Sequence, residues 1–525
     1  MKLFSGAVLL IVTFTALFTC NRNSEKTISE KKGGSINIAI QGNADNLFPF
    51  NIREYYTQEI NSNLLSQSLT IVNPDGDIQP QLAKSWQAGH NQITYVLKGK
   101  VKWSNGQHFT AKDVSTTFYF INQNQDKIST LFNTDLISEI EIVDSLTIRF
   151  KFKEDVSEPH SVTRFPILNN QQIKNAENWD NLKKSYYEDF VGCGPFLLKK
   201  YYKNEIQLIR NEKYDINYPL LDEINVKFFS STDTLNSWLE SASIDLMPDL
   251  PHNLLKSVKK LTDFEVISSV EPGYTFLGWN LKNEETVALA FRKGLSHALD
   301  RQTMVDGIMS GYATVFDSPA YPEFWAYHQT DPLEFDLEKS RKYLNEAGWF
   351  TNKTTRRLEK DGSQLKLKIL TNNENDLRVK VAINIKAYWE AIGAEVTVVS
   401  VPWGDFLKAL KSKEYDAALI SWVASDKFDP TELYHSSGIK SDNNFMGYAN
   451  DSVDFFIENA LSSKHKSSRE KNWLKFQKKI IQDMPVTVLF GKRILNVVSK
   501  NLKNVTINSD GFLYNAKEYW LDDRK

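Results

Sequence analysis

Apolar and polar positions follow two different periods along this chain, and each period predicts a different element. Residues 35–41, SINIAIQ, alternate in the manner of a half-buried strand. Runs of strand-forming residues also predict one strand pair at 140–144 with 146–152 and another at 196–202 with 205–210.

Two segments carry helix signals. Thr110 is followed three residues later by Asp113, a capping box that predicts a helix beginning near Ala111. Residues 375–392 repeat apolar side chains at helical spacing on one face, and Gly393 can end that helix. The apolar stripe of this second helix consists of Leu377, Val381, Ile385, Tyr388 and Ile392.

Helix and strand then alternate. Residues 394–401 predict a strand, residues 403–410 a helix, and residues 415–422 a buried strand. Alternation of this kind favours α/β lobes with largely parallel sheets.

Size and charge narrow the class of protein. The chain has 525 residues, and because single cores stop growing at roughly 250–300 residues, we expect at least two lobes. The 63 Lys and Arg nearly balance the 65 Asp and Glu, so the net charge of −2 provides no electrostatic basis for binding nucleic acid. The 12 Trp and 21 Tyr suit either a cleft that stacks on ligands or large cores.

The N-terminus has the pattern of an export signal. An apolar run from Leu3 to Phe18 follows one lysine and is shorter than the roughly 20 residues that span a membrane. The run ends at Cys20 in a sequence that resembles a bacterial lipobox, so residues 1–20 predict a lipoprotein signal peptide with Cys20 as the lipid anchor. The alternative is ordinary signal-peptide cleavage just downstream of this position. Residues 21–32 are polar and predict a flexible tether. Cys193 would then be a single, buried free thiol, and no disulfide is expected.

Catalytic and metal motifs are mostly absent from the sequence. None of the eight histidines forms HExxH or another tight metal spacing, and no GxSxG or Gly-rich phosphate loop occurs. Ser257 and Ser463 each begin an S-x-x-K match, but no KTG accompanies them. We therefore expect no enzyme activity, no metal site and no cofactor.

Several segments together resemble the family-5 extracellular solute-binding proteins, the oligopeptide and dipeptide receptors of ABC importers. The most specific is Ile78–Phe120, with its Pro-x-Leu-Ala-x-Ser-Trp opening and its Thr-Ala-x-Asp-Val helix start. The segment VGCGPFLLKKYY is similar to the family's Gly-Thr-Gly-Pro hairpin, with Cys193 in place of Thr. FRKGLSHALDR, YDAALISW and DMPVTVLF follow in the family's order, and the resemblance covers nearly the whole mature chain.

The resemblance implies an α/β fold of the type II periplasmic-binding-protein kind, with two lobes around a cleft and an inserted third subdomain. Lobe I would combine residues 33–60, 186–279 and 485–525. The inserted subdomain would be residues 61–185, and lobe II residues 280–484. Segments 277–280 and 485–490 would form the hinge.

The resemblance also points to ligand-binding residues in the segment WVASDKFDP, Trp422–Pro430. Peptide-binding members carry, four residues before the Pro, an Asp that pairs with the α-ammonium of the ligand. That position is Asp426 here, whereas counting forward from Trp422 gives Ser425, because this chain has one extra residue. Enclosing an ammonium group is costly unless a carboxylate and hydrogen bonds replace water. The alternative is that Asp426 caps a turn and Asp429 begins the next one.

Three aromatic residues are further candidates for the wall of the cleft: Trp422, Trp403 and Tyr274. Each of them could instead pack in a core.

The resemblance implies an exported, periplasmic, lipid-anchored and monomeric substrate-binding protein that captures short peptides and delivers them to a membrane permease. The ATPase would be a partner subunit. Three alternatives stay open: the same fold with a non-peptide solute (a nickel chelate, haem or an oligosaccharide), an exported hydrolase, and a signalling or chaperone-like protein that uses the same cleft.

Overall fold

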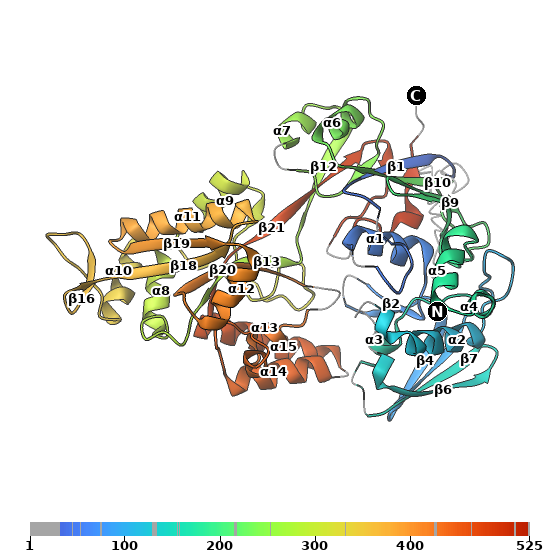
Figure 1. The fold of residues 1–525 in the computed structure, drawn as a ribbon, viewed down its shortest axis with the longest axis horizontal. Helices are drawn as coiled ribbons and strands as arrows, with labels where there is room; N and C mark the ends of the chain where they lie inside the picture. The colour runs from blue at the N-terminus through green and yellow to red at the C-terminus, as the bar shows by residue number, and fades with distance from the viewer. Residues whose placement is uncertain are drawn as a thin grey trace, which may run out of the picture.

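The computed structural model describes residues 32–522, apart from 45, 53, 74–75, 129–133, 155, 157, 215–217, 252–253, 331, 425–427, 464 and 509–510. The described chain forms two halves joined along one side by long strands (Figure 1). The first half lies on the right of Figure 1 and the second half on the left.

The first half contains a sheet with the strand order β11-β1-β10-β9-β8. Its elements are β1 (Ser35–Gln41), α1 (Tyr55–Ile60), a π-helix (Asn61–Leu65), β8 (Phe196–Tyr202), β9 (Glu205–Arg210), β10 (Glu223–Phe229), α6 (Thr232–Glu240), β11 (Leu246–Met247), α7 (Leu255–Val258) and β12 (Phe264–Val270).

The second half contains a sheet with the strand order β19-β18-β20-β13, covered by helices. Its strands are β13 (Gly273–Trp279), β14 (Ala313–Thr314), β15 (Phe350–Thr351), β16 (Leu358–Lys360), β17 (Ser363–Gln364), β18 (Lys366–Asn372), β19 (Glu395–Val401) and β20 (Ala417–Val423). Its helices are α8 (Leu289–His297), α9 (Arg301–Met309), α10 (Leu337–Glu346), α11 (Asp376–Ala391), α12 (Trp403–Ser412), α13 (Thr431–Tyr434), α14 (Asp451–Ser462) and α15 (Lys466–Asp483).

The expectation of largely parallel sheets is confirmed for the alternating strands β19 and β20, which are parallel to β18, but it is wrong for the two sheets as a whole. β1 is parallel to β10 and β11, and β18 is parallel to β19 and β20. The other pairs in these sheets are antiparallel. The antiparallel pairing of β8 with β9 has a local cause, because a turn of two residues can join only antiparallel strands.

A single strand, β21 (Val486–Ser499), belongs to both sheets. Its residues 493–499 pair with β12 of the first half, and its residues 486–490 pair with β13 of the second half. The chain therefore passes between the halves at residues 271–272 and at 491–492, where Gly491 and Lys492 also pair with the short strand β14 of the second half. The segments expected to form the hinge, 277–280 and 485–490, lie instead largely within the sheet of the second half, where Leu277 is opposite Leu419 and Thr487.

Between β1 and β8 the chain builds a separate antiparallel sheet with the order β4-β5-β7-β6. Its helix α2 begins at Ala111, as the capping box predicts: the carboxylate of Asp113 accepts the backbone N–H of Thr110 at 2.8 Å. This region contains β2 (Thr70–Val72), β3 (Ile78–Pro80), β4 (Ala83–Gly89), β5 (Gln92–Leu97), α2 (Ala111–Gln123), β6 (Ile137–Asp144), β7 (Thr147–Phe152), α3 (Pro159–Thr163), α4 (Asn170–Ala176) and α5 (Trp179–Glu188).

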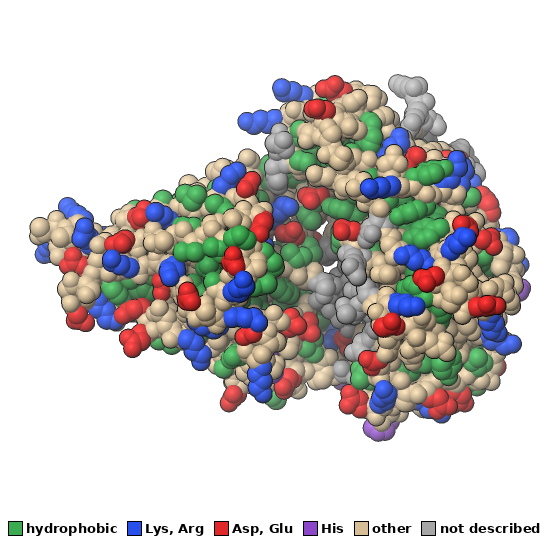
Figure 2. All heavy atoms as spheres, in the orientation of Figure 1, with side chains coloured by type: hydrophobic (Ala, Val, Ile, Leu, Met, Phe, Trp, Pro, Cys, Tyr) green, Lys and Arg blue, Asp and Glu red, His purple; other side chains and the backbone are tan. Residues whose placement is uncertain are grey.

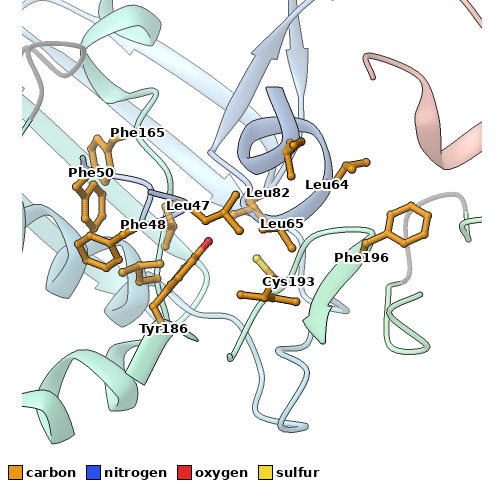
Figure 3. Packing of buried hydrophobic residues seen from close by; sticks show 14 of the residues in the cluster. Leu47, Phe48, Phe50, Leu64, Leu65, Leu82, Phe165, Tyr186, Cys193 and Phe196 are labelled. Atoms are coloured by element: carbon orange, nitrogen blue, oxygen red, sulfur yellow. The ribbon is translucent and has the colours of Figure 1, made fainter. Parts of the chain in front are cut away.

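One hydrophobic core runs through the β1 sheet and this antiparallel region. Figure 3 shows Cys193 within this core near Leu65, Tyr186 and Phe196. Cys193 is a free, buried thiol, as expected, and burial raises its pKa. The next residue, Gly194, has no room for a side chain, because a Cβ atom there would lie 2.5 Å from the carbonyl oxygen of Leu65.

Candidate functional site

The surface is hollowed between the two halves (Figure 2). In the second half, β18, β19 and β20 are mutually parallel, so their carboxyl ends lie on one edge of the sheet. The loops that leave this edge are tied together, because the backbone N–H of Trp403 donates to Glu374 Oε1 at 2.8 Å. Open α/β sheets bind ligands beyond the carboxyl ends of their parallel strands, so this edge is a candidate binding site.

Arg378 is the central cation of this edge. It lies in the first turn of α11, just after the end of β18, and is half-buried. Its Nη1 donates to Asn372 Oδ1 at 2.7 Å, and its Nε lies 3.4 Å from Ser421 Oγ, at the end of β20. Burial lowers the pKa of Arg378, and the charge of Glu271 acts in the opposite direction. The guanidinium group nevertheless keeps its charge at neutral pH.

Glu271 lies where the chain passes from the first half to the second. Burial raises the pKa of its carboxyl group, and the charge of Asp249 adds to this effect. Lys492 and Arg378 lower the pKa but do not cancel the increase. Within the described residues, neither Glu271 nor Arg378 forms an ion pair within 4 Å. A half-buried carboxylate and a half-buried guanidinium group are thus both available to a solute.

The first half contributes Asp249 and Tyr56 to the same region. Asp249 follows the carboxyl end of β11, and its Oδ1 lies 3.8 Å from Lys492 Nζ on β21. Burial raises the pKa of Tyr56, and the charges of Asp249, Glu59 and Glu271 raise it further. The hydroxyl of Tyr56 therefore stays protonated and can donate a hydrogen bond. The two strand edges meet here in a cluster of both charge signs.

Asp426 lies outside the described residues, but both ends of its segment are placed. The segment begins beside the crossing point, because the backbone N–H of Ala424 donates to the carbonyl oxygen of Pro272 at 2.7 Å. Beyond it, Asp429 accepts the backbone N–H of Thr431 at 2.9 Å and so caps the turn before α13. Cys20 also lies outside the described residues.

The three aromatic candidates lie at different depths. Trp403 is 43% exposed and stacks on Phe406, with ring centroids 5.4 Å apart. Trp422 is half-buried, and its ring centroid lies 5.5 Å from that of Tyr274. Tyr274 itself is 1% exposed, and its hydroxyl shares a 2.9 Å hydrogen bond with that of Tyr434. Tyr274 therefore supports Trp422 from within the core.

Sequence reasoning did not single out Arg378, Glu271, Asp249 or Lys492. The only local signal is Glu271-Pro272-Gly273, a charged residue before two turn-forming residues between apolar strands. Nothing local connects that turn with Arg378, more than a hundred residues later.

No described helix is both long and apolar enough to cross a membrane. No group of three or more His, Cys, Asp or Glu side chains in the described chain is placed to hold a metal ion.

Comparisons with known proteins agree with this architecture. Residues 77–445 match the family model described as bacterial extracellular solute-binding proteins, family 5. The oligopeptide-binding protein AppA of Bacillus subtilis is 26% identical over 476 residues, which is 87% of this chain and 86% of AppA. Heme-binding protein A of Haemophilus influenzae is 26% identical over 428 residues, 75% of each chain.

Among solved structures, HbpA2 from Haemophilus parasuis superposes with a TM-score of 0.82 at 18% identity, covering 93% of this chain and 100% of that one. The fold is therefore that of the type II periplasmic binding proteins, as the sequence resemblance implied. The chain belongs to the bacterial extracellular solute-binding proteins of family 5.

Proposed function

We propose that this protein is the substrate-binding protein of an ABC importer and that it captures short peptides between its two halves. The observation that carries the proposal is the pair Glu271 and Arg378. Each is half-buried where the strand edges meet, and neither has an ion-pair partner among the described residues. A short peptide with free ends carries one group of each sign, and charge-assisted hydrogen bonds to such groups are the strong ones.

Asp426 is the proposed partner of the peptide's α-ammonium group. The described residue before its segment, Ala424, is hydrogen-bonded to Pro272, the chain neighbour of Glu271. This supports the proposal that Asp426 and Glu271 act on the same ammonium group. Trp422 and Trp403 would form apolar walls, with Tyr274 behind Trp422. An extended peptide could pair with backbone groups at the strand edges, which gives affinity without selecting a sequence.

Closure would be a rotation of the halves about residues 271–272 and 491–492. We propose the divisions expected from the family, lobe I at 33–60, 186–279 and 485–525, the inserted subdomain at 61–185, and lobe II at 280–484, with one change. Residues 273–279 and 486–490, which pair within the sheet of the second half, would move with lobe II. A solute favours the closed form only to the extent that it binds that form better than the open one. The permease and ATPase are partner proteins in this proposal, and the substrate-binding protein acts as a monomer.

Export and anchoring complete the proposal. The apolar run before Cys20 supports a lipoprotein signal peptide, with the mature protein held at the membrane, facing the periplasm, through lipidated Cys20. Substitution of Cys20 by Ser should release the protein from membranes, and retention of the variant would contradict the anchor.

A second candidate is the same mode of capture with a non-peptide solute. The observation that favours it is Heme-binding protein A, which is as similar to this chain in percent identity as the oligopeptide-binding relative.

Native mass spectrometry distinguishes the two candidates. The chain from residue 21 is purified without refolding and its bound masses are recorded. A ladder of short peptides is the expected result. One discrete non-peptide mass would replace the peptide proposal by the second candidate. Addition of peptide and glycoside substrates tests the hydrolase alternative, for which no turnover is expected.

A further inference from the structure

A second contact joins the two halves on the side of the hollow opposite the crossing strands. Lys466 Nζ lies 2.7 Å from Asp77 Oδ1, and Arg469 Nη1 lies 2.8 Å from Glu158 Oε1. Both cations belong to the start of α15 in the second half, whereas Asp77 precedes β3 and Glu158 precedes α3 in the first half. In Figure 1 the hairpin of α14 and α15 reaches towards α3 below the hollow, while β12 and β21 run above it.

An aromatic side chain lies beneath both cations. The ring centroid of Trp325 is 5.4 Å from Lys466 Nζ and 5.8 Å from Arg469 Cζ, distances at which a cation is attracted to an indole face. Trp325 belongs to the second half and is half-buried against its core. On the facing turn of the first half, a Cβ atom at Gly76 would lie 2.8 Å from Trp325 Cδ1. The contact therefore combines charge with close packing.

We call this contact the ionic latch: Asp77 and Glu158 with Lys466 and Arg469, together with Trp325 and Gly76. Three features favour attraction across it. The charges are opposite, the acids lie near the N-terminus of an 18-residue helix whose dipole favours anions there, and the Arg469 side chain is only 17% exposed. The Lys466 and Asp77 side chains are 41% and 45% exposed, so salt must screen that pair.

We propose that the ionic latch holds the two halves together in the solute-free protein. With the crossing strands on one side and the latch on the other, a solute reaches the site only through the openings between them. Latch opening then controls how far the halves separate and which solutes can enter. This inference rests on the proposed function only in taking the hollow between the halves as the solute-binding site. The latch itself would act in the protein without solute.

Small-angle X-ray scattering of the solute-free chain from residue 21 tests the proposal. Raising NaCl from about 0.01 M to about 1 M shortens the screening length from about 30 Å to about 3 Å, so the radius of gyration of the wild type should increase. The double variant Lys466→Met/Arg469→Met should already have the larger radius at low salt and should not respond to NaCl. An unchanged radius and salt response in this variant would overturn the proposal.

The chain offers a matched control for the loss of two charges. Lys408→Met/Lys411→Met also removes two positive charges. It breaks the ion pairs of Lys408 with Asp405 at 3.0 Å and of Lys411 with Asp442 at 2.9 Å, and both pairs lie within the second half. This control should behave like the wild type. The charge exchange Lys466→Asp/Asp77→Lys should restore much of the low-salt compactness that Lys466→Asp alone removes; failure of that rescue would also count against the latch.

Glycine substitutions test the packing part separately. Gly76 and Gly362 have nearly the same φ, +74° and +77°, but only Gly76 faces another side chain within 4 Å. Both alanine variants carry similar backbone strain, but only Gly76→Ala should increase the radius of gyration. Only Gly76→Ala should also change the fluorescence contribution of Trp325, which is identified as the part of the tryptophan emission lost in Trp325→Phe. Equal behaviour of the two variants would exclude Trp325 and Gly76 from the latch. None of these tests uses a solute. A negative result for the latch would therefore not contradict the peptide proposal, and a negative result for peptide binding would not contradict the latch.

Discussion

The two contacts between the halves differ in chemistry, and the difference indicates what each can do. At the crossing strands the contact is made by backbone: every residue of β13 is buried, and β21 is paired in both sheets. At the ionic latch the contact is made by side chains, most of which are partly exposed. Burial and strand pairing make the first contact permanent, whereas partly exposed ion pairs are weak and reversible. The first contact can bend, and the second can open.

The charged cluster lies at the permanent contact. Glu271, Arg378, Asp249 and Lys492 surround the two places where the chain passes between the halves. In the proposed closure, a solute bound there would contact both halves close to the axis of rotation. Groups near a rotation axis move little when the halves rotate, so the residues that bind the solute would keep their positions during closure.

The largest expected effect concerns the crossing strands. A Cβ atom at Gly273 would lie 2.2 Å from the carbonyl oxygen of Trp422 and 2.9 Å from Val423 Cα. Because backbone cannot move aside cheaply, Gly273→Ala should lower the free energy of unfolding by about 3 kcal/mol. Urea denaturation measures this value. Gly404→Ala is the control, since nothing lies within 4 Å of that position, and an equal loss there would contradict the argument.

Loss of the proposed ammonium partner should have the next largest effect. Asp426→Ala should weaken the binding of peptides with free amino termini about 30-fold, or ~2 kcal/mol, because a buried ammonium group would lose its counter-charge. Calorimetric titration should show little change for N-acetylated peptides. An equal loss for both kinds of peptide would remove Asp426 from this role.

Arg378→Met tests whether the Arg378 cation binds the carboxylate end of the peptide. It keeps most of the apolar stem but removes the cation near Glu271, so affinity for peptides with a free carboxyl end should fall about tenfold, or ~1.4 kcal/mol. C-amidated peptides should lose less. Lys380→Met, an exposed position on the same helix, serves as the control and should bind like the wild type. The role fails if the two variants lose the same affinity.

The raised pKa of Glu271 should make the stability of the protein depend on pH. Its pKa is raised in the folded state, so the folded protein binds the proton more tightly than the unfolded chain does. The contribution of this group to stability is therefore present at low pH and is lost as pH rises through the raised pKa. Glu271→Gln should raise the Tm of the solute-free protein at pH 7, and the difference from the wild type should disappear near pH 4. A Tm difference that is independent of pH would contradict this explanation.

The smallest expected effect on stability concerns the ionic latch. Lys466→Met/Arg469→Met should change the free energy of unfolding by less than about 1 kcal/mol for each pair, because partly exposed ion pairs contribute little. The same variant should nevertheless change the radius of gyration. A stability loss as large as that of Gly273→Ala would show that the two contacts do not differ in the way proposed.

Local patterns predicted many elements well. The alternation in residues 35–41 corresponds to β1, and the Thr110–Asp113 capping box corresponds to the start of α2. Residues 375–392 correspond to α11, which ends before Gly393, where φ is +101°. These features depend on neighbours within a few residues, so sequence alone contains the relevant physics. The direction of most other strands does not follow from such patterns, because it depends on which distant strand supplies the partner.

Many of the elements, the need for more than one core, the buried thiol and the family resemblance can be derived from the amino-acid sequence, because each depends on local periodicity, composition or a run of motifs. The remaining features depend on contacts between distant parts of the chain. Only the fold brings Glu271 near Arg378, places Tyr274 behind Trp422 and sets Lys466 against Asp77, 389 positions away along the chain. Contacts at such separations arise from how the sheets pair and pack, which no local pattern specifies.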